Sequence, residues 1–312
     1  MKPFTGILFL ACALAAVPAV GQSNQQAGTA VLDEKTRIIL DVTRVNLLFT
    51  VTDKKGRFVT DLTKDDFAIR EGKRPQTILE FVSESDLPLR LAILVDTSNS
   101  IRDRFKFIQE AAIEFINSVV RPNQDKAAMI SFDTAAELQA DLTGDLATLD
   151  KVIRNLRPGG GTALYDAIYF ACRDKLMMDQ PRHKFRRAMV ILSDGEDNQS
   201  RYSRDQALEM AQKADVVIYT ISTNITRVET DGDKVLKYLS EETGGVTFFP
   251  FKVEDLSQSF ENIANELRHQ YNLLYRPEPM KTDGTYQTVD VRVKERKGLI
   301  VRARKGYYSP RL

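Results

Sequence analysis

The chain has 312 residues, with 44 Lys and Arg against 43 Asp and Glu, and its formal net charge is +1. Proteins that bind a phosphate backbone usually carry a clear basic excess, so this balance argues against nucleic-acid binding as the main activity. The two cysteines exclude a disulfide-stapled scaffold. Charged residues make up 28% and hydrophobic residues 43%, which is typical of an ordinary folded protein. The length allows one large domain and a smaller one.

Residues 1–21 have the pattern of a secretory signal peptide. Lys2 supplies a positive charge, and an apolar run extends from Phe4 to Val20 and ends in small residues. A membrane-spanning anchor is less favoured, because the run is short and contains Pro18. A bacterial lipoprotein with Cys12 as the lipidated residue is a further, less favoured alternative.

Cleavage after residue 21 changes both the charge and the thiol count. The remaining chain loses Lys2, so its acidic and basic residues balance, and Cys172 is its only cysteine. One thiol cannot form an internal disulfide, which suits a bacterial envelope or secreted protein better than a small eukaryotic ectodomain. No second apolar run is long enough to span a bilayer. We therefore expect a secreted, periplasmic or cell-envelope protein without a transmembrane segment after cleavage.

The segment after the predicted signal peptide begins with a polar stretch and continues with short strands. Residues 22–36 lack periodicity, and we expect them to form a flexible leader. From residue 37 to 87 the pattern is β, with turn residues such as Glu71–Pro75 between the strands. The predicted strands are 45–52, 57–60, 67–70 and 77–82.

The hydrophobic pattern changes at residue 88. Leu91–Val95 and Ala188–Leu192 are continuous apolar runs, as expected for strands buried on both faces. Strands that alternate with helices predict a parallel sheet covered on both sides. The other predicted strands are 127–132, 137–142, 216–221 and 246–249, and the predicted helices are 105–119, 146–156, 163–178, 204–214, 234–239 and 256–267.

After residue 270 the pattern is again β, with predicted strands at 271–275, 288–293 and 299–304. Each β flank is too short to form a stable domain by itself, but together the two flanks have the size of one β-sandwich. We expect an α/β, doubly wound and mostly parallel sheet at 88–270, inserted in or flanked by a β-sandwich formed by 37–87 and 271–312. Two unrelated small sheets packed against the α/β domain are an equally favoured alternative.

Polar side chains follow the first buried strand. Asp96, Ser98 and Ser100 are spaced two residues apart and stand just before a helix. Ligand sites in open α/β sheets lie outside the carboxyl ends of the strands. Carboxylate and hydroxyl oxygens are hard ligands that suit Mg²⁺ or Mn²⁺. The pattern alone is weak, because Ser98 or Ser100 could simply cap the helix.

Two further positions strengthen this signal. Thr162 follows Pro158–Gly161 and precedes a helix, and Asp194 ends the second apolar strand, so both are expected on the same rim of the sheet. The glycines allow the backbone to approach the site closely. They are not a phosphate-binding loop, because the Gly-Lys-Ser/Thr ending is absent.

With these five residues the sequence resembles the von Willebrand factor type A (VWA) domain. The metal-ion-dependent adhesion site (MIDAS) of that family uses Asp-x-Ser-x-Ser, then a loop Thr, then a later Asp-Gly, and all five positions match here. The resemblance covers about residues 88–270. The flanking segments Leu62–Lys73 and Val301–Tyr308 resemble the VWFA-related secreted proteins of Acidobacteria.

The resemblance implies a role for each of these five residues. Ser98 and Ser100 bind the metal directly, Thr162 binds directly or through water, and Asp96 and Asp194 lie mainly behind the coordinating groups. Neutral hydroxyls leave a dication under-neutralised, and Mg²⁺ keeps water at its open positions. A partner carboxylate can replace one such water. We expect one Mg²⁺ or Mn²⁺ site that captures an Asp or Glu of a protein ligand, in adhesion or assembly.

An enzyme is the main alternative from another class. Asp96 could serve a Mg²⁺-dependent hydrolase or phosphotransferase, but that chemistry needs a second Asp two residues on, where Ser98 stands. A Ser/His/Asp hydrolase needs a base, and His183 and His269 are the only histidines. A purely structural envelope protein, in which the metal only stabilises the domain, is a third hypothesis. We favour a non-enzymatic protein.

Other reactive side chains are expected to be structural or solvated. Asp103, Glu196 and Asp197 lie close in sequence to the candidate metal ligands and could form a secondary cation site, but solvated loop acids are the favoured interpretation. Cys172 falls on the apolar side of the 163–178 helix, where a packed thiol is expected.

Overall fold

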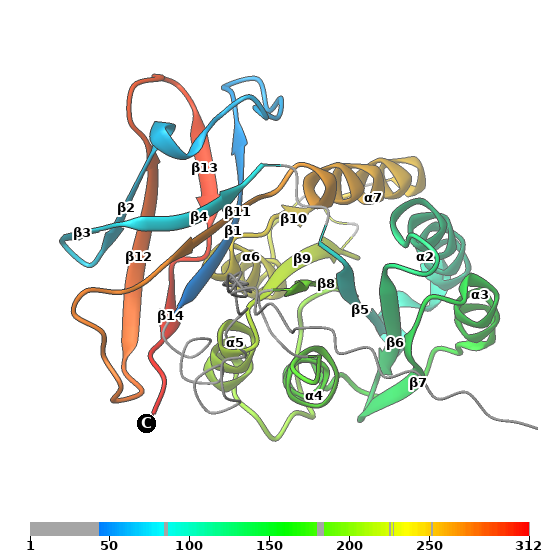
Figure 1. Cartoon of the computed structure of the whole chain (residues 1–312). Helices are drawn as coiled ribbons and strands as arrows, with labels where there is room; N and C mark the ends of the chain where they lie inside the picture. Colours follow the sequence, from blue (N-terminus) through cyan, green and yellow to red (C-terminus); the bar gives the residue numbers. More distant parts are fainter. Residues whose placement is uncertain are drawn as a thin grey trace, which may run out of the picture.

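The computed structural model describes residues 44–83, 87–179, 184–224, 226, 228–250 and 252–311. The predicted signal peptide and leader, Cys12 and His183 lie outside the described residues, so those predictions are not addressed by the structure. Three sheets organise the described chain: one of six strands and two of four. In Figure 1 the six-stranded sheet and its helices lie beside the two smaller sheets.

The six-stranded sheet has the order β10-β9-β8-β5-β6-β7. Its strands run parallel except β7, which pairs with β6 in the antiparallel sense. Every residue of β5 and of β8 is buried, as their continuous apolar runs predicted. The strands are β5 (Leu89–Asp96), β6 (Lys126–Phe132), β7 (Ala136–Thr143), β8 (Arg186–Ser193), β9 (Val216–Ser222) and β10 (Thr247–Phe248).

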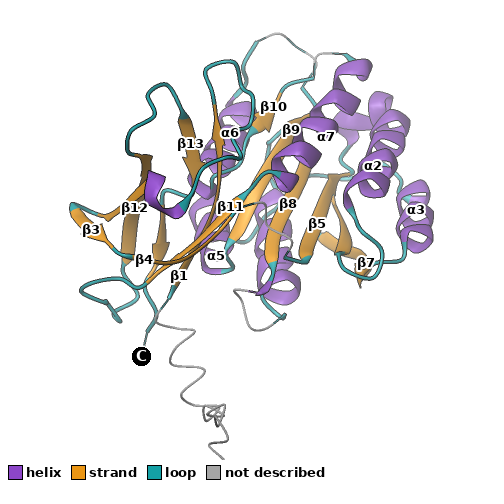
Figure 2. Cartoon of the chain, turned by 45° about the horizontal axis from the view of Figure 1, so that its top comes forward, coloured by secondary structure: helices purple, strands orange, loops and turns teal. Residues whose placement is uncertain are grey.

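Helices cover both faces of this sheet (Figure 2). Successive residues of β5 point to opposite faces, so Leu91 and Ile93 pack with α2, α3 and α7, whereas Ala92 and Leu94 pack with α4, α5 and α6. Within the described ranges no helix is long and apolar enough to cross a membrane. The helices are α2 (Phe105–Val119), α3 (Leu146–Asn155), α4 (Leu164–Phe170), α5 (Arg204–Lys213), α6 (Asp231–Thr243) and α7 (Val253–Arg268).

Both flanks contribute strands to each of the smaller sheets. In the order β13-β1-β11-β4, the N-terminal β1 lies between two C-terminal strands, and in the order β14-β12-β2-β3, β12 lies beside β2. Side chains of both sheets form one apolar core. The flanks therefore build their sheets together, and the alternative of two unrelated sheets is wrong. The strands are β1 (Val45–Thr52), β2 (Phe67–Glu71), β3 (Arg74–Gln76), β4 (Ile78–Val82), β11 (Tyr271–Tyr275), β12 (Tyr286–Val293), β13 (Ile300–Ala303) and β14 (Gly306–Tyr308).

The strand predicted at 57–60 is wrong, and only an isolated bridge joins Phe58 to Thr52. The Val59 amide still donates to β1, at 2.8 Å from the Val51 carbonyl oxygen. Beyond that point the Tyr271 hydroxyl replaces a strand partner, since it donates to the Val59 carbonyl at 2.8 Å and accepts from the Leu62 amide at 3.1 Å. A tertiary side-chain contact thus ends the pairing.

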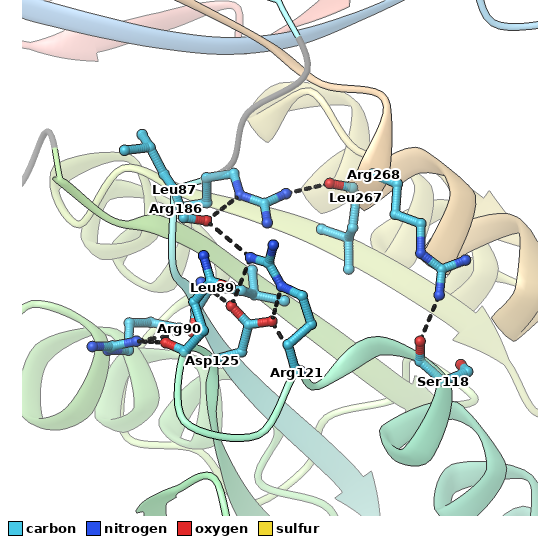
Figure 3. Close-up of polar contacts among 10 residues, drawn as sticks. Leu87, Leu89, Arg90, Ser118, Arg121, Asp125, Arg186, Leu267 and Arg268 are labelled. Carbon is cyan, nitrogen blue, oxygen red and sulfur yellow. Dashed lines mark hydrogen bonds and ion pairs between the residues drawn. The ribbon is translucent and has the colours of Figure 1, made fainter.

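The chain enters and leaves the α/β part at neighbouring points, which Figure 3 shows. The Arg186 Nε donates to the Leu87 carbonyl at 2.9 Å, and another nitrogen of the same guanidinium donates to the Leu267 carbonyl. The buried Asp125 carboxylate accepts from the Leu89 amide at 2.7 Å and from Arg121 Nε at 2.7 Å. Arg186 therefore joins both crossing points. The domain limits at 88 and 270 remain a prediction.

A second polar contact joins the two parts of the molecule. Arg304, which follows β13 and is 8% exposed, donates to Asp215 Oδ1 at 2.5 Å and to the Asn46 carbonyl at 2.7 Å. Asp215 lies between α5 and β9, whereas Asn46 belongs to β1. The buried Arg304 guanidinium thus joins the loop between α5 and β9, in the α/β part, to strand β1 of a flanking sheet.

Candidate functional site

The candidate residues Asp96 and Asp194 stand at the ends of neighbouring parallel strands. Val95 of β5 pairs with Leu192 of β8, so the two strands end side by side. Asp96 is the last residue of β5, and Asp194 directly follows β8. The topology therefore brings both carboxylates to one rim of the sheet, as the apolar runs predicted.

Asp96 is fully buried and organises the turn that follows it. Its Oδ1 accepts from the Ser98 amide at 2.8 Å, and its Oδ2 accepts from the Ser193 hydroxyl at 2.7 Å. Burial raises the pKa of Asp96 to about 6, while the bonds from Ser193 and Ser98 oppose that rise and the nearby Asp194 charge adds to it. Both carboxylate oxygens are thus engaged by the protein itself, so Asp96 acts on the rim through its neighbours.

Ser98, Ser100 and Asp194 form a chain of direct contacts. The hydroxyl oxygens of Ser98 and Ser100 are 2.9 Å apart, and the Ser100 hydroxyl donates to Asp194 Oδ2 at 2.7 Å. Ser98 directly precedes the 3-10 helix η2 (Asn99–Arg104), yet its side chain makes no capping hydrogen bond. A simple capping role for Ser98 is therefore wrong. Ser100 is exposed, so this chain of oxygen atoms reaches solvent.

Thr162 lies on an adjoining loop that is docked through its backbone. The Gly159 amide donates to the Thr97 carbonyl at 2.6 Å, and the Asn99 side chain reaches the Gly160 carbonyl at 3.5 Å. Thr162 is 5% exposed, and within the described part of the chain its hydroxyl makes no hydrogen bond. The structure thus joins four of the five predicted residues by direct contacts and places the fifth on a loop held against them.

The segment after Asp194 fixes that loop, and sequence reasoning missed most of its members. Asn198 Oδ1 accepts from the Thr162 amide at 3.0 Å, and the Thr162 carbonyl accepts from the Asn198 amide at 3.0 Å. Asp197 Oδ2 accepts from the Tyr165 amide at 3.0 Å and from the Ser200 hydroxyl at 2.6 Å. The interpretation of Asp197 as a solvated loop acid is therefore wrong, because its carboxylate joins its own loop to the start of α4. The only sequence feature that could have indicated these contacts is the run of acidic and amide residues soon after Asp194.

A close approach of two glycines sets the position of Asp194. Gly195 has φ +80°, and a Cβ built on it would lie 2.1 Å from the Gly232 carbonyl oxygen. A Cβ on Gly232, in the first turn of α6, would lie 2.1 Å from the Asp194 carbonyl oxygen. Only glycine combines this backbone conformation with this contact. The start of α6 therefore supports the Asp194 turn directly.

The donor set of the rim suits a small hard cation. The Ser100 hydroxyl lies within hydrogen-bond distance of both the Ser98 hydroxyl and Asp194 Oδ2, and Thr162 lies on the adjoining loop. Mg²⁺ and Mn²⁺ prefer such oxygen donors. Across the described residues, the rim included, no group of three or more His, Cys, Asp or Glu side chains could hold a metal ion, so the suggested secondary site from Asp103, Glu196 and Asp197 has no support, and the candidate rim site depends on its hydroxyl oxygens.

The sequence matches the family model of the von Willebrand factor type A domain over residues 91–266, which is more than half of the chain. It matches none of the curated proteins with which it was compared.

Several solved structures are similar to the chain at low sequence identity. A von Willebrand factor type A protein from Catenulispora acidiphila is 13% identical, with a TM-score of 0.52 over 80% of this chain and 75% of that one. Proximal thread matrix protein 1 from the mussel byssus, with a zinc-occupied MIDAS motif, is 19% identical, with a TM-score of 0.50 over 63% and 49% of the two chains. The PilB minor pilin from Streptococcus sanguinis is 14% identical, with a TM-score of 0.47 over 59% of this chain and 62% of the pilin.

Proposed function

The chain belongs to the von Willebrand factor type A domain family, and from this premise we propose that it is an exported, non-enzymatic binding protein. Its rim residues Asp96, Ser98, Ser100, Thr162 and Asp194 form a metal-ion-dependent adhesion site. The site holds one Mg²⁺ or Mn²⁺ and captures an Asp or Glu of a protein partner. The protein acts outside the cytoplasm, in the periplasm, at the cell envelope or as a secreted protein.

The contact chain from Ser98 through Ser100 to Asp194 is the observation that carries this proposal. Two hydroxyls 2.9 Å apart, with a carboxylate 2.7 Å from the Ser100 hydroxyl and access to solvent at Ser100, support the proposal that these oxygens bind one cation. The zinc-occupied MIDAS motif of the mussel protein, which has a similar fold, supports binding of a divalent metal at this rim. The predicted signal peptide at residues 1–21 supports export.

The chain's own residues divide the work at this site. Ser98 and Ser100 offer hydroxyl oxygens, and Asp194 orients Ser100 by accepting a hydrogen bond from its hydroxyl at 2.7 Å. Asp96 holds the turn from below through the Ser98 amide. A bound dication supplies a positive centre that these few charges leave under-neutralised, which favours an anionic ligand from a partner.

Metal binding tests the proposal directly. Titrating MgCl₂ or MnCl₂ into metal-free protein of residues 22–312 is expected to show one site by calorimetry. A metal that binds only the folded state also raises the melting temperature. The absence of both heat and thermal shift at about 5 mM of either metal, a concentration that reaches weak sites of this type, contradicts the proposal.

Partner capture has a separate test. Immobilised protein is incubated with extract of the native envelope in Mg²⁺ or in EDTA, and we expect retained proteins to depend on the metal. Variant Asp96→Ala serves as a bait without the site, and Asp103→Ala, in η2 but outside the contact chain, is the matched control. Retention that is equal in Mg²⁺ and EDTA, and equal with the Asp96→Ala bait, contradicts capture through a metal.

The hydrogen bond from the Thr162 amide to Asn198 predicts that Asn198 positions Thr162 at the metal site. Asn198→Ala removes the acceptor for the Thr162 amide, and we expect Mg²⁺ affinity to fall by about 10-fold, as is typical when a group behind a ligand is lost. Asn198→Asp keeps an acceptor oxygen and is expected to restore most of the affinity. The control is Gln199→Ala, since Gln199 bonds Thr162 through its backbone amide. Equal affinities of Asn198→Ala and wild type, by calorimetry, contradict this role.

A further inference from the structure

An arginine side chain is held against the two loops that carry the candidate metal ligands. Asn99 directly follows Ser98 in the first of these loops, and its Oδ1 accepts from the Arg102 guanidinium at 2.8 Å. The Asn99 Nδ2 reaches across to the Gly160 carbonyl at 3.5 Å, in the second loop. Asn99 therefore joins the two loops and places the Arg102 guanidinium beside them, on the rim of the sheet.

Arg102 has hydrogen-bonding capacity that the protein leaves unused. The residue is exposed, and within the described part of the chain no carboxylate forms an ion pair with it. By contrast, the exposed Arg154 lies 2.9 Å from Asp150 of its own helix. A guanidinium has five N–H donors in a planar fork, and Asn99 accepts from this one through a single nitrogen. The remaining donors fit a carboxylate through two parallel hydrogen bonds.

The location of this positive charge restricts what it can bind. A guanidinium and a bound dication repel each other, so Arg102 does not favour metal binding as such. An anionic ligand that contacts both centres is attracted by both. A partner with two neighbouring carboxylates gains charge-assisted hydrogen bonds at Arg102, and a partner with a single carboxylate does not. The arginine therefore discriminates between partners that a metal ion alone would treat alike.

We propose that Arg102 selects the partner at the metal site, and that this partner presents two acidic residues close together. The inference rests on the proposed function, because the metal takes the first carboxylate and Arg102 takes the second. Asn99 acts as a positioning residue for the guanidinium. The recognised segment is an acidic stretch of a protein such as Asp-Gly-Asp, in which alternate side chains of an extended chain point the same way.

Two peptides that differ in one side chain test this inference. One is acetyl-Gly-Asp-Gly-Asp-Gly-amide, and the other has Asn in place of the second Asp. With protein of residues 22–312 in saturating MgCl₂, NMR titration is expected to show about tenfold tighter binding of the two-acid peptide, since a bidentate charged pair contributes that much. Arg102→Gln is expected to remove most of this preference. Arg102→Lys keeps the charge without the planar fork, and we expect it to retain about threefold.

The matched control is Arg157→Gln, which removes a similar charge from the same region of the sequence. Arg157 is also exposed and lies three residues before Gly160. Its guanidinium turns back to the Arg154 and Leu156 carbonyls, at 2.9 and 2.7 Å, so the preference for the two-acid peptide should not change. A rise in melting temperature with Mg²⁺ shows that Arg102→Gln keeps the metal site, and Arg102→Lys decides the matter if it does not.

The outcomes separate this inference from the function on which it rests. Equal affinities of the two peptides for the wild type, or a preference that survives in Arg102→Gln, overturn the role of Arg102. If both peptides still need Mg²⁺ to bind, capture of a carboxylate by the metal stands without it. Peptide binding that is the same in Mg²⁺ and in EDTA contradicts the proposed function, and this inference with it.

Discussion

Replacing Asp96 with alanine is expected to weaken Mg²⁺ binding by about 100-fold, the upper range for a residue that supports the ligands of a metal. The substitution removes the acceptor of both the Ser98 amide and the Ser193 hydroxyl. The turn that presents Ser98 and Ser100 then loses its support on the buried side. It also removes one negative charge from behind the cation. Calorimetry and the Mg²⁺-dependent rise in melting temperature both measure this loss.

The same variant separates binding from folding. Asp96 is buried and its pKa is raised, so the metal-free protein gains little from keeping it charged, and we expect Asp96→Ala to remain folded. Asp96→Asn keeps the shape of the side chain, and its Mg²⁺ affinity is expected to lie between those of Asp96→Ala and the wild type. Asp103→Ala is the control for a nearby exposed acid. Wild-type Mg²⁺ affinity in folded Asp96→Ala contradicts the site.

Replacing Arg186 with methionine is expected to lower the free energy of unfolding by about 3–5 kcal/mol, since two hydrogen bonds from one buried charged group are lost. The Leu267 carbonyl loses its side-chain donor, whereas the Leu87 carbonyl keeps Arg121 at 3.5 Å. Arg186 is 5% exposed, and its guanidinium joins the Leu87 and Leu267 carbonyls (Figure 3). Methionine fills much of the space but donates no hydrogen bond. Urea denaturation of the full mature chain measures the change.

Arg268→Met is the matched control for that measurement. Arg268 is exposed, and it donates to the Ser118 carbonyl at 2.5 Å, also in Figure 3. A single solvent-exposed contact is expected to contribute about 1 kcal/mol or less. If Arg186→Met and Arg268→Met destabilise the protein equally, Arg186 is not the link between the two crossing points.

The sequence allowed prediction of the central sheet because its strands carry their own signal. Leu91–Val95 and Ala188–Leu192 are apolar throughout, which only strands buried on both faces require. Once two such strands are parallel neighbours, their carboxyl ends must meet, so Asp96 and Asp194 were expected to lie together. The candidate site was predicted from three segments taken together, which carry Asp96 to Ser100, Thr162 and Asp194, and not from any single motif.

Other parts of the fold and of the candidate site depend on tertiary contacts that the local sequence pattern does not indicate. The strand β3 stands where the sequence predicted a turn, because pairing with β2 overrides the turn residues near Pro75. Asn198 supports Thr162 across a separation of 36 residues, and an asparagine in a loop has no periodicity to mark it. The close packing of Gly195 against Gly232, where an added Cβ on either residue would lie 2.1 Å from a backbone oxygen, is likewise visible only in three dimensions.

The two crossing points joined by Arg186 have a mechanical consequence. Leu87 lies just before β5 begins, whereas Asp96 stands where β5 ends, so attachment and rim occupy opposite ends of the same strand. Tension between a partner on the rim and the flanking sheets would run lengthwise along β5 and its neighbours β6 and β8. Their hydrogen bonds would then be loaded in shear, many at once, instead of opening one by one. Two tethers instead of one also oppose rotation, so the rim keeps its direction under load.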